Sequence, residues 1–144
     1  MKQYLLIICY LFLGVPPWAF AENKTVHYEP EIVELHGILE LQTFPGPPNY
    51  ESIKNGDAIE RGWYLKLDHP IIIKPQKSPT DLGWKIEYNV RILQLSIGSN
   101  DIKIWRRLKA GKRIKIQGTL FNRHTGHHHS RALMSVDSIV EEMQ

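Results

Sequence analysis

Four histidines gather in one short polar segment near the carboxyl end of the chain: His124, His127, His128 and His129. Residues 127 and 129 are two apart, so their side chains project to the same side of an extended segment. His124 could fold back across Gly126 and supply a third imidazole. Neutral imidazole is a common ligand of zinc, copper and nickel, and three of them leave an open coordination position. The spacing therefore predicts a candidate divalent-metal site without cysteine, with Asp137 as the nearest acid along the chain.

The same four histidines also have a structural interpretation, which the sequence favours. In a hairpin turn, imidazole rings hydrogen-bond loop carbonyls and pack beside aromatic residues such as Phe121 or Tyr50. We expect no cofactor unless this turn holds zinc, copper or nickel.

A second candidate site is the segment around three prolines, Pro45, Pro47 and Pro48, with nearby aromatic residues. Rigid prolines would hold neighbouring side chains in place for stacking on a sugar ring or for gripping an extended peptide. The alternative is that the prolines cap an edge strand while an aromatic ring covers one end of the core. The candidate ligand-binding residues of this segment are Phe44, Asn49, Tyr50 and Trp63.

An enzyme is the class that the sequence supports least. The chain has no Gly-x-Ser-x-Gly elbow, no phosphate-binding loop and no His-Glu-x-x-His helix. Asp57, Glu60, Asp68 and His69 could pair as acid and base, but their spacing is typical of ordinary strand ends. We therefore expect a protein without enzymatic activity.

Short alternating apolar segments separated by Pro and Gly turns predict a mainly β domain. The order of three strands, one short helix and two further strands predicts an OB-like five-stranded β-barrel, with the helix between the third and fourth strands. A β-sandwich is the alternative, although it would need seven strands and five are found. The expected strands are Glu31–Leu41, Trp63–Ile73, Val90–Ile97, Arg113–Phe121 and Arg131–Val140, and the helix is Ile102–Ala110.

The amino-terminal residues 1–21 have the order of a cleaved secretory signal. Lys2 precedes an apolar run from Tyr4 to Val15, and the small residues of Ala19-Phe20-Ala21 come before polar residues. The apolar run has about 12 residues, whereas a membrane-spanning helix needs about 20. We expect cleavage after Ala21, a periplasmic or secreted location, and no transmembrane segment in the mature chain.

Removing the signal also removes Cys9, the one cysteine of the chain, so disulfides play no part in the mature domain. Residues 22–144 are the size of a single domain. A basic run from Lys103 to Lys115 contains no acid, and such a run is most often a solvated face. Export argues against nucleic acid as its partner.

Several unusual motifs are spread along the chain. They are Gly37-Ile38-Leu39, the segment Thr43 to Ile53 with Phe-Pro-Gly-Pro-Pro-Asn-Tyr, Gly56-Asp57, the strand Trp63 to Pro70, and Gly118 to Phe121 leading to Thr-Gly-His-His-His at 125–129. These motifs resemble DUF4431, an uncharacterised bacterial family, and the likeness covers roughly Tyr28 to Val140. The resemblance implies an exported OB-like domain without an established activity. Members of the family often have a cysteine near the end of the second strand, where this chain has Ile71, Ile72 and Ile73.

Taken together, these patterns predict an exported binding or interaction module for a cell-envelope component or a partner protein. The alternative function is divalent-metal binding by the turn His124 to His129. A binding module should lose ligand affinity when Tyr50 is changed and should be indifferent to chelators. A metal-binding protein should respond to metals and chelators.

Overall fold

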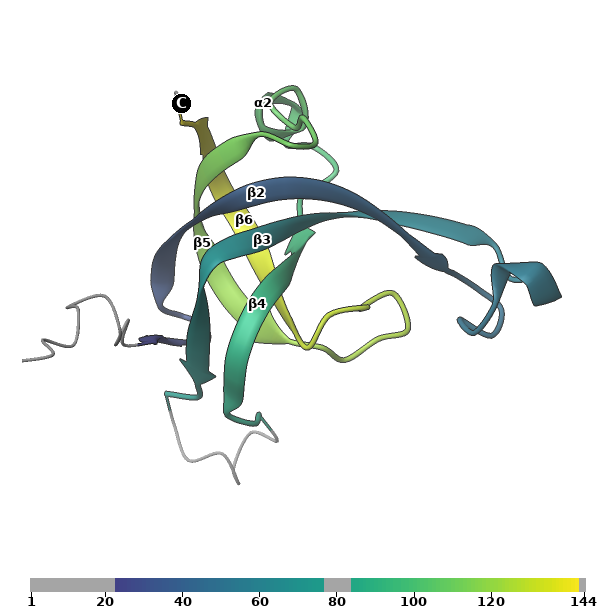
Figure 1. Cartoon of the computed structure of the whole chain (residues 1–144), viewed down its shortest axis with the longest axis horizontal. Coiled ribbons are helices and arrows are strands. Elements are labelled where there is room, and N and C mark those ends of the chain that lie inside the picture. The colour runs from purple at the N-terminus through teal and green to yellow at the C-terminus, as the bar shows by residue number, and fades with distance from the viewer. Residues whose placement is uncertain (1–22, 77–83, 143–144) are drawn as a thin grey trace, which may run out of the picture.

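The computed structural model describes residues 23–76 and 84–142, and this part of the chain is mainly β. The chain order of the elements places one short helix, α2, between the fourth and fifth strands (Figure 1). The strands are β1 (Lys24–His27), β2 (Ile32–Pro45), β3 (Ile59–Lys74), β4 (Glu87–Ser96), β5 (Arg113–Asn122) and β6 (Ala132–Glu141), and the helical segments are η1 (Ile53–Asn55) and α2 (Ile102–Trp105).

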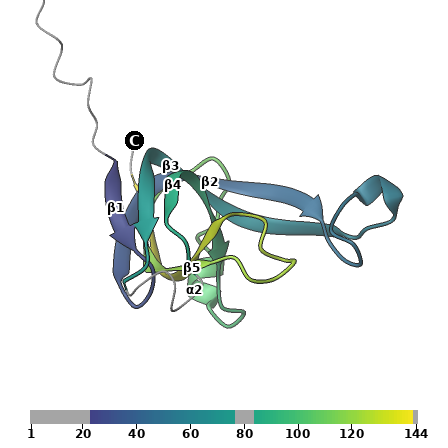
Figure 2. The same ribbon diagram turned by 90° about the horizontal axis from the view of Figure 1, so that it is seen from below.

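All six strands belong to one sheet with the order β1-β3-β2-β5-β6-β4. An additional antiparallel pairing joins β3 to β4, so hydrogen bonding runs from β3 through β2, β5, β6 and β4 back to β3. The β4–β6 pair and the β1–β3 pair are parallel, and the other pairs are antiparallel. The strands wrap around a common centre, and the β2–β3 hairpin projects from it as a long arm (Figure 2).

The sheet has six strands, and the expectation of five was wrong. The missed strand is β1, which pairs with residues 71–74 of β3. Its sequence, Lys-Thr-Val-His, contains a single buried residue, Val26. Four residues are too few to display a periodic pattern, so pairing with β3 decides that this segment is a strand.

The β2–β3 hairpin is longer than expected at its tip. The prolines were expected to end the first strand after Leu41, yet β2 continues to Pro45, which pairs with Ile59. A proline lacks a backbone N–H, but at the last position of a strand the lost donor costs little. Beyond it, the Gly46 amide donates to the Ala58 carbonyl at 2.7 Å and prolongs the ladder.

In contrast, α2 is shorter than the helix that was expected to reach Ala110.

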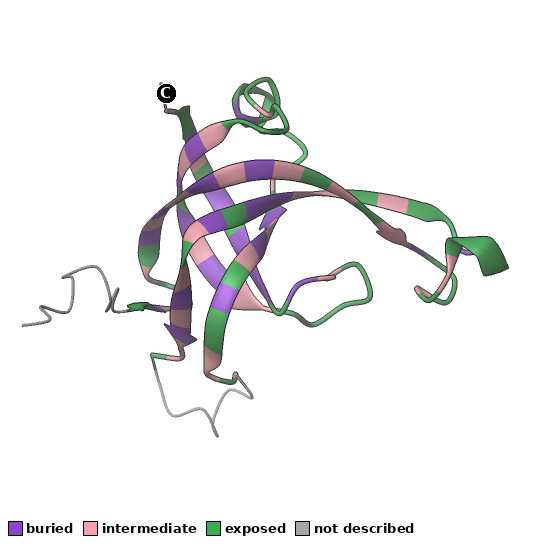
Figure 3. Cartoon of the chain, in the orientation of Figure 1, coloured by how far each residue is buried: buried purple, intermediate pink, exposed green. Residues whose placement is uncertain are grey.

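The core is made of alternating strand residues, as the sequence pattern predicts. Along β2, Val33, Leu35, Gly37 and Leu39 are buried while the residues between them are partly exposed (Figure 3). The corresponding residues of β3 to β6 include Leu65, Ile73, Leu93, Ile116 and Met134. Burial of each such side chain stabilises the fold by roughly 1.5–3 kcal/mol. This alternation sets which side chains of β3 and β4 remain on the outer face.

Two glycines permit close approach of neighbouring strands. A Cβ at Gly118 would lie 1.9 Å from the Ser135 carbonyl oxygen, and one at Gly37 would lie 2.2 Å from that of Lys66. The ladder is regular at Gly37, because this residue pairs with both Leu67 and Ile114.

No helix within residues 23–76 and 84–142 is long and apolar enough to cross a membrane. The expected signal, residues 1–21, lies outside the described residues.

Candidate functional site

The two candidate sites from the sequence meet in space. The turn between β5 and β6, which carries the histidines, lies beneath the projecting β2–β3 hairpin, which carries the prolines (Figure 1). The Tyr50 hydroxyl lies 3.2 Å from Nε2 of His127, and the two rings meet edge to face at 5.3 Å between centroids. A Cβ at Gly126 would lie 3.0 Å from the Tyr50 ring, so a residue without a side chain allows this contact. We call the joined region the loop junction, defined by Phe44, Tyr50, Glu60, His127 and His129.

Glu60 is the centre of the loop junction. Nδ1 of His127 donates to one carboxylate oxygen at 2.5 Å, and Nε2 of His129 donates to the other at 3.0 Å. With Nδ1 as the donor, a neutral His127 ring leaves Nε2 as an acceptor, so Tyr50 donates its hydroxyl proton to it. Burial raises the pKa of Glu60, but the hydrogen bonds from His129 and His127 outweigh burial and hold that pKa below its usual value.

His129 is the most enclosed member of the loop junction. Its ring stacks on Phe44 with 4.4 Å between centroids and an interplanar angle of 5°. Its side chain is 13 % exposed, whereas that of His127 is 58 % exposed. Gln94 of β4 completes the support, because its amide oxygen accepts from the His129 backbone N–H at 2.7 Å and its amide nitrogen donates to the His127 carbonyl at 2.8 Å. His129 is therefore a structural anchor, and His127 is the ring that faces solvent.

The other two histidines form a separate pair on the same turn. Nδ1 of His124 donates to the Asn122 carbonyl at 3.1 Å, and the His124 backbone N–H donates to Nδ1 of His128 at 3.1 Å. Both rings lie against Phe121, at 6.0 and 5.7 Å between centroids. Burial lowers the pKa of His128, and the neighbouring ring of His124 lowers it further. This is the hairpin packing that the structural interpretation expects.

His124 does not join His127 and His129 in this structure. Its hydrogen bond to the Asn122 carbonyl, at 3.1 Å, holds its ring beside Phe121 instead. Among the described residues, no group of three or more His, Cys, Asp or Glu side chains is arranged to hold a metal ion. Asp137 is the nearest acid along the chain, but the acid that contacts the histidines is Glu60. Glu60 is far from them in sequence, and the β2–β3 hairpin brings it to them.

Asp57 organises the loop that presents Tyr50. Its carboxylate accepts backbone N–H groups from Ser52, Asn49 and Glu51 at 2.8 to 2.9 Å. These hydrogen bonds lower the pKa of Asp57. The side-chain amide of Asn49 also donates to the Asp57 carboxylate at 3.2 Å. Asn49, a predicted ligand-binding residue, therefore uses its side chain within the loop.

Tyr50 has a backbone φ of 61°. The left-handed region is uncommon for a residue with a bulky side chain and costs of order 1–3 kcal/mol. The hydrogen bonds around Asp57 oppose this strain and direct the Tyr50 ring toward His127.

A groove of about 410 Å³ lies beside the loop junction, lined by residues 60–63 of β3 and 94–96 of β4. Trp63, the predicted aromatic residue of β3, lines it together with Trp105 of α2, whose indole donates to the Gly98 carbonyl at 2.9 Å. Glu60, His127 and His128 form one wall of the groove. Phe44, Asn49 and Tyr50 do not line it. Of the predicted residues, the structure thus brings Trp63, His127 and His128 into one groove, with Tyr50 bonded to its wall.

Three residues of this region were not predicted as site residues: Glu60, Gln94 and Trp105. The strand pairings Tyr64–Gln94 and Leu41–Trp63 align these elements, and no local spacing contains that information. The exposure of Trp105 follows from the shortness of α2, which the sequence predicted to extend to Ala110.

Comparison with known proteins identifies one family. Residues 92–140 match the family described as a domain of unknown function, DUF4431. The histidine turn lies within the match, and the proline-rich segment lies before it. No curated protein and no solved structure matches the chain.

Proposed function

We propose, from the match of residues 92–140 to the DUF4431 family model together with the loop junction, that the chain is an exported OB-like binding module whose ligand occupies the groove beside that junction. The ligand class is a cell-envelope component or a partner protein. The observation that carries the proposal is the junction itself, where two loops distant in sequence are joined beside a groove lined by two tryptophans.

The strand pairings support an OB-like barrel. Five strands, β2 to β6, are linked in a ring of pairings with one parallel pair, β4–β6. In OB barrels the ligand face lies on the second and third strands, between the loop that joins the first two strands and the loop that joins the last two. Here those parts correspond to β3, β4, the proline-rich loop and the histidine turn. The groove occupies that position, and β1 is an addition at the edge of β3.

The chemistry of the groove suits an extended polar ligand with flat apolar faces. Trp63 and Trp105 offer ring surfaces for stacking, and the side chain of Trp105 is 43 % exposed. Arg61 also lines the groove and offers hydrogen-bond donors, whereas Gln94 and Glu60 fix the polar wall through their bonds to His127 and His129. Such a mixture of a few aromatic faces with fixed polar groups is typical of ligand-binding grooves. The envelope of an exported protein supplies glycans and extended protein segments of this kind.

The hydroxyl, imidazole and carboxylate of Tyr50, His127 and Glu60 do not add a hydrolytic function to this proposal. Activation of a nucleophile depends on a low-dielectric site from which water is excluded. His127 is more than half exposed, so solvent screens the interaction. We assign the three groups the role of holding the two loops together.

Tryptophan fluorescence tests the proposal directly. Two of the four tryptophans line the groove, so binding of peptidoglycan fragments or lipopolysaccharide should change the emission. Tyr50→Ala should weaken that binding about tenfold or more, because it removes one side of the loop junction. Tyr88→Ala is the matched control, since Tyr88 is 60 % exposed on β4 outside the groove. Equal affinities for the two variants contradict the proposal, as does an emission change that persists when Trp63 and Trp105 are both replaced by Phe.

Divalent-metal binding is the second candidate function, because two imidazoles and a carboxylate converge at Glu60. These groups are hydrogen-bonded to one another, so a metal must displace both bonds. We expect zinc, copper or nickel at 100 times the dissociation constant to stabilise the folded protein by about 2.7 kcal/mol if it binds. The measurement is thermal unfolding in chelator and then with each metal. A shift that vanishes when His127 and His129 are both changed to Ala supports metal binding. An unchanged midpoint with all three metals eliminates it.

A further inference from the structure

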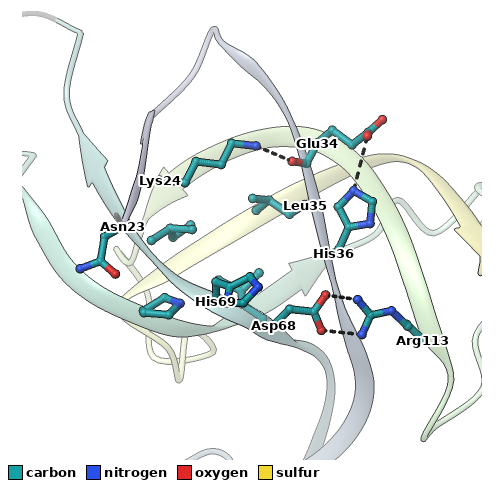
Figure 4. Close-up of a pocket in the computed structure, with 11 residues that line it drawn as sticks. Asn23, Lys24, Glu34, Leu35, His36, Asp68, His69 and Arg113 are labelled. Carbon is teal, nitrogen blue, oxygen red and sulfur yellow. Dashed lines mark hydrogen bonds and ion pairs between the residues drawn. The ribbon is translucent and has the colours of Figure 1, made fainter. Parts of the chain in front are cut away.

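A second pocket lies away from the groove, where β2 and β3 separate. Their antiparallel ladder ends at the pair Gly37–Leu67, and β3 begins to pair with β1 at Ile71. Residues 68–70 of β3 have no partner on β1 or β2, and the opening beside them has a volume of about 400 Å³. This is within the range of small-molecule sites. Figure 4 shows the side chains around it.

The floor of this pocket is apolar and its rim is charged. Leu35 of β2 and Leu67 and Ile71 of β3 are each less than a tenth exposed, and they line the pocket together with Pro70. The polar residues of the rim are Asn23, Lys24, Glu34, His36, Asp68, His69 and Arg113. An apolar floor below polar groups favours an amphiphile, with a hydrocarbon part inside and a polar head at the rim.

Both carboxylates of the rim are already neutralised. Asp68 receives two hydrogen bonds from the Arg113 guanidinium, at 2.8 and 2.5 Å (Figure 4). Glu34 accepts from Gln117 at 2.9 Å and lies 3.4 Å from the Lys115 ammonium. Neither acid therefore presents an uncompensated negative charge to the pocket.

Lys24 differs from these residues. Its ammonium donates to the backbone carbonyl of Glu34 at 3.0 Å (Figure 4), and none of the described carboxylates forms an ion pair with it. A carbonyl is a dipole and leaves the unit charge uncompensated. Arg113 is shared between Asp68 and Glu142, and Glu142 does not line the pocket. Of the residues that line the pocket, Lys24 is therefore the cation that no described carboxylate neutralises.

We propose that this pocket binds an anionic amphiphile, with its alkyl chain on the floor of Leu35, Leu67 and Ile71 and its carboxylate or phosphate head beside Lys24. The site is distinct from the groove, which lies between other strands and loops, and so the proposal does not depend on the proposed function. Bulk envelope lipid and a free fatty acid share this chemistry.

Calorimetric titration with monomeric decanoate tests the proposal. Burial of each methylene group strengthens binding about three- to fourfold, so decanoate should bind about tenfold more tightly than octanoate. Decyltrimethylammonium should bind more weakly than decanoate. Lys24→Gln should weaken decanoate binding about two- to fivefold, as expected for one exposed ion pair, and should leave decanol binding unchanged. Lys103→Gln is the matched control, because Lys103 is an exposed lysine of α2 outside the pocket.

Amide and methyl chemical shifts locate the bound chain. Decanoate should perturb Leu35, Leu67 and Ile71 and leave Trp63 and Trp105 unaffected. The proposal is overturned if decyltrimethylammonium binds as well as decanoate, if Lys103→Gln has the same effect as Lys24→Gln, or if the shifts move in the groove. Binding of vesicles that contain phosphatidylglycerol without binding of decanoate would also overturn it, because the ligand would then be a lipid surface.

Discussion

Replacement of Glu60 by Gln tests the loop junction most sharply. Glu60→Gln keeps the shape of the side chain and removes the charge that accepts from His127 and His129 at 2.5 and 3.0 Å. A hydrogen bond to a charged group contributes about 1.5–3 kcal/mol, and solvent screening reduces this where the groups are exposed. Gln still accepts one of the two bonds. We therefore expect a loss of about 1–2 kcal/mol in the free energy of unfolding at pH 7, or a fall of several degrees in the midpoint.

The pH dependence of this loss follows from the pKa of Glu60. That pKa lies below its usual value in the folded protein, so the ionised carboxylate stabilises the fold above the usual pKa of a glutamate. This contribution is lost as the pH falls through the lowered, folded-state value. The difference between the wild-type protein and Glu60→Gln should thus be present at pH 7 and shrink progressively as the pH falls below the usual pKa of a glutamate.

Thermal unfolding followed by circular dichroism measures both effects. Glu31→Gln is the matched control, because Glu31 forms a single, more exposed contact with His27 at 2.9 Å and should cost well under 1 kcal/mol. The reasoning is refuted if the two variants unfold at the same temperature at pH 7. It is also refuted if the difference made by Glu60→Gln persists undiminished at pH 3.

Three further predictions concern other parts of the chain. Asp57→Asn should release the loop that carries Tyr50. We expect faster hydrogen exchange at the three backbone amides that donate hydrogen bonds to Asp57, and cleavage of the loop in limited proteolysis. Unchanged exchange would contradict the role of Asp57. Gly118→Ala should lower the free energy of unfolding by more than about 3 kcal/mol, because its Cβ would lie 1.9 Å from the Ser135 carbonyl oxygen. Gly98→Ala should cost far less, because its Cβ meets only the flexible side chain of an aspartate. Similar midpoints for the two variants in denaturant unfolding would refute the argument. We also predict that the exported protein begins at Glu22, and amino-terminal sequencing that finds Met1 in the secreted fraction would reject the signal.

Much of the fold could be read from local patterns. Alternation in segments such as Ile32 to Leu39 and Arg113 to Leu120 follows from the two-residue period of a strand with one buried face, and the structure confirms a mainly β fold. The family resemblance is likewise confirmed over residues 92–140. Strand ends were harder to predict, because Pro45 can end a ladder or interrupt one, and the difference depends on its partner Ile59.

The candidate residues were also found locally, but their grouping was not. A cluster of histidines and a proline-rich aromatic loop are visible as unusual compositions, since each lies within about ten residues of chain. Three contacts depend on how β2 and β3 pair and on how far their hairpin projects. They are the contact of Tyr50 with His127, the bridge of Glu60 to two histidines, and the packing of His124 against Phe121.

The sequence by itself determined the strand-rich character, the core-facing residues and the two polar segments, because each of these depends on neighbours a few positions away. Only the tertiary structure decided which acid meets the histidines, which tryptophans share a groove and where a second pocket opens beside Lys24. The physical reason is that strand pairing joins residues about 30 to 70 positions apart, as in the contacts of Glu60 with His129 and of Gln94 with His127. No short-range pattern of residues encodes that register.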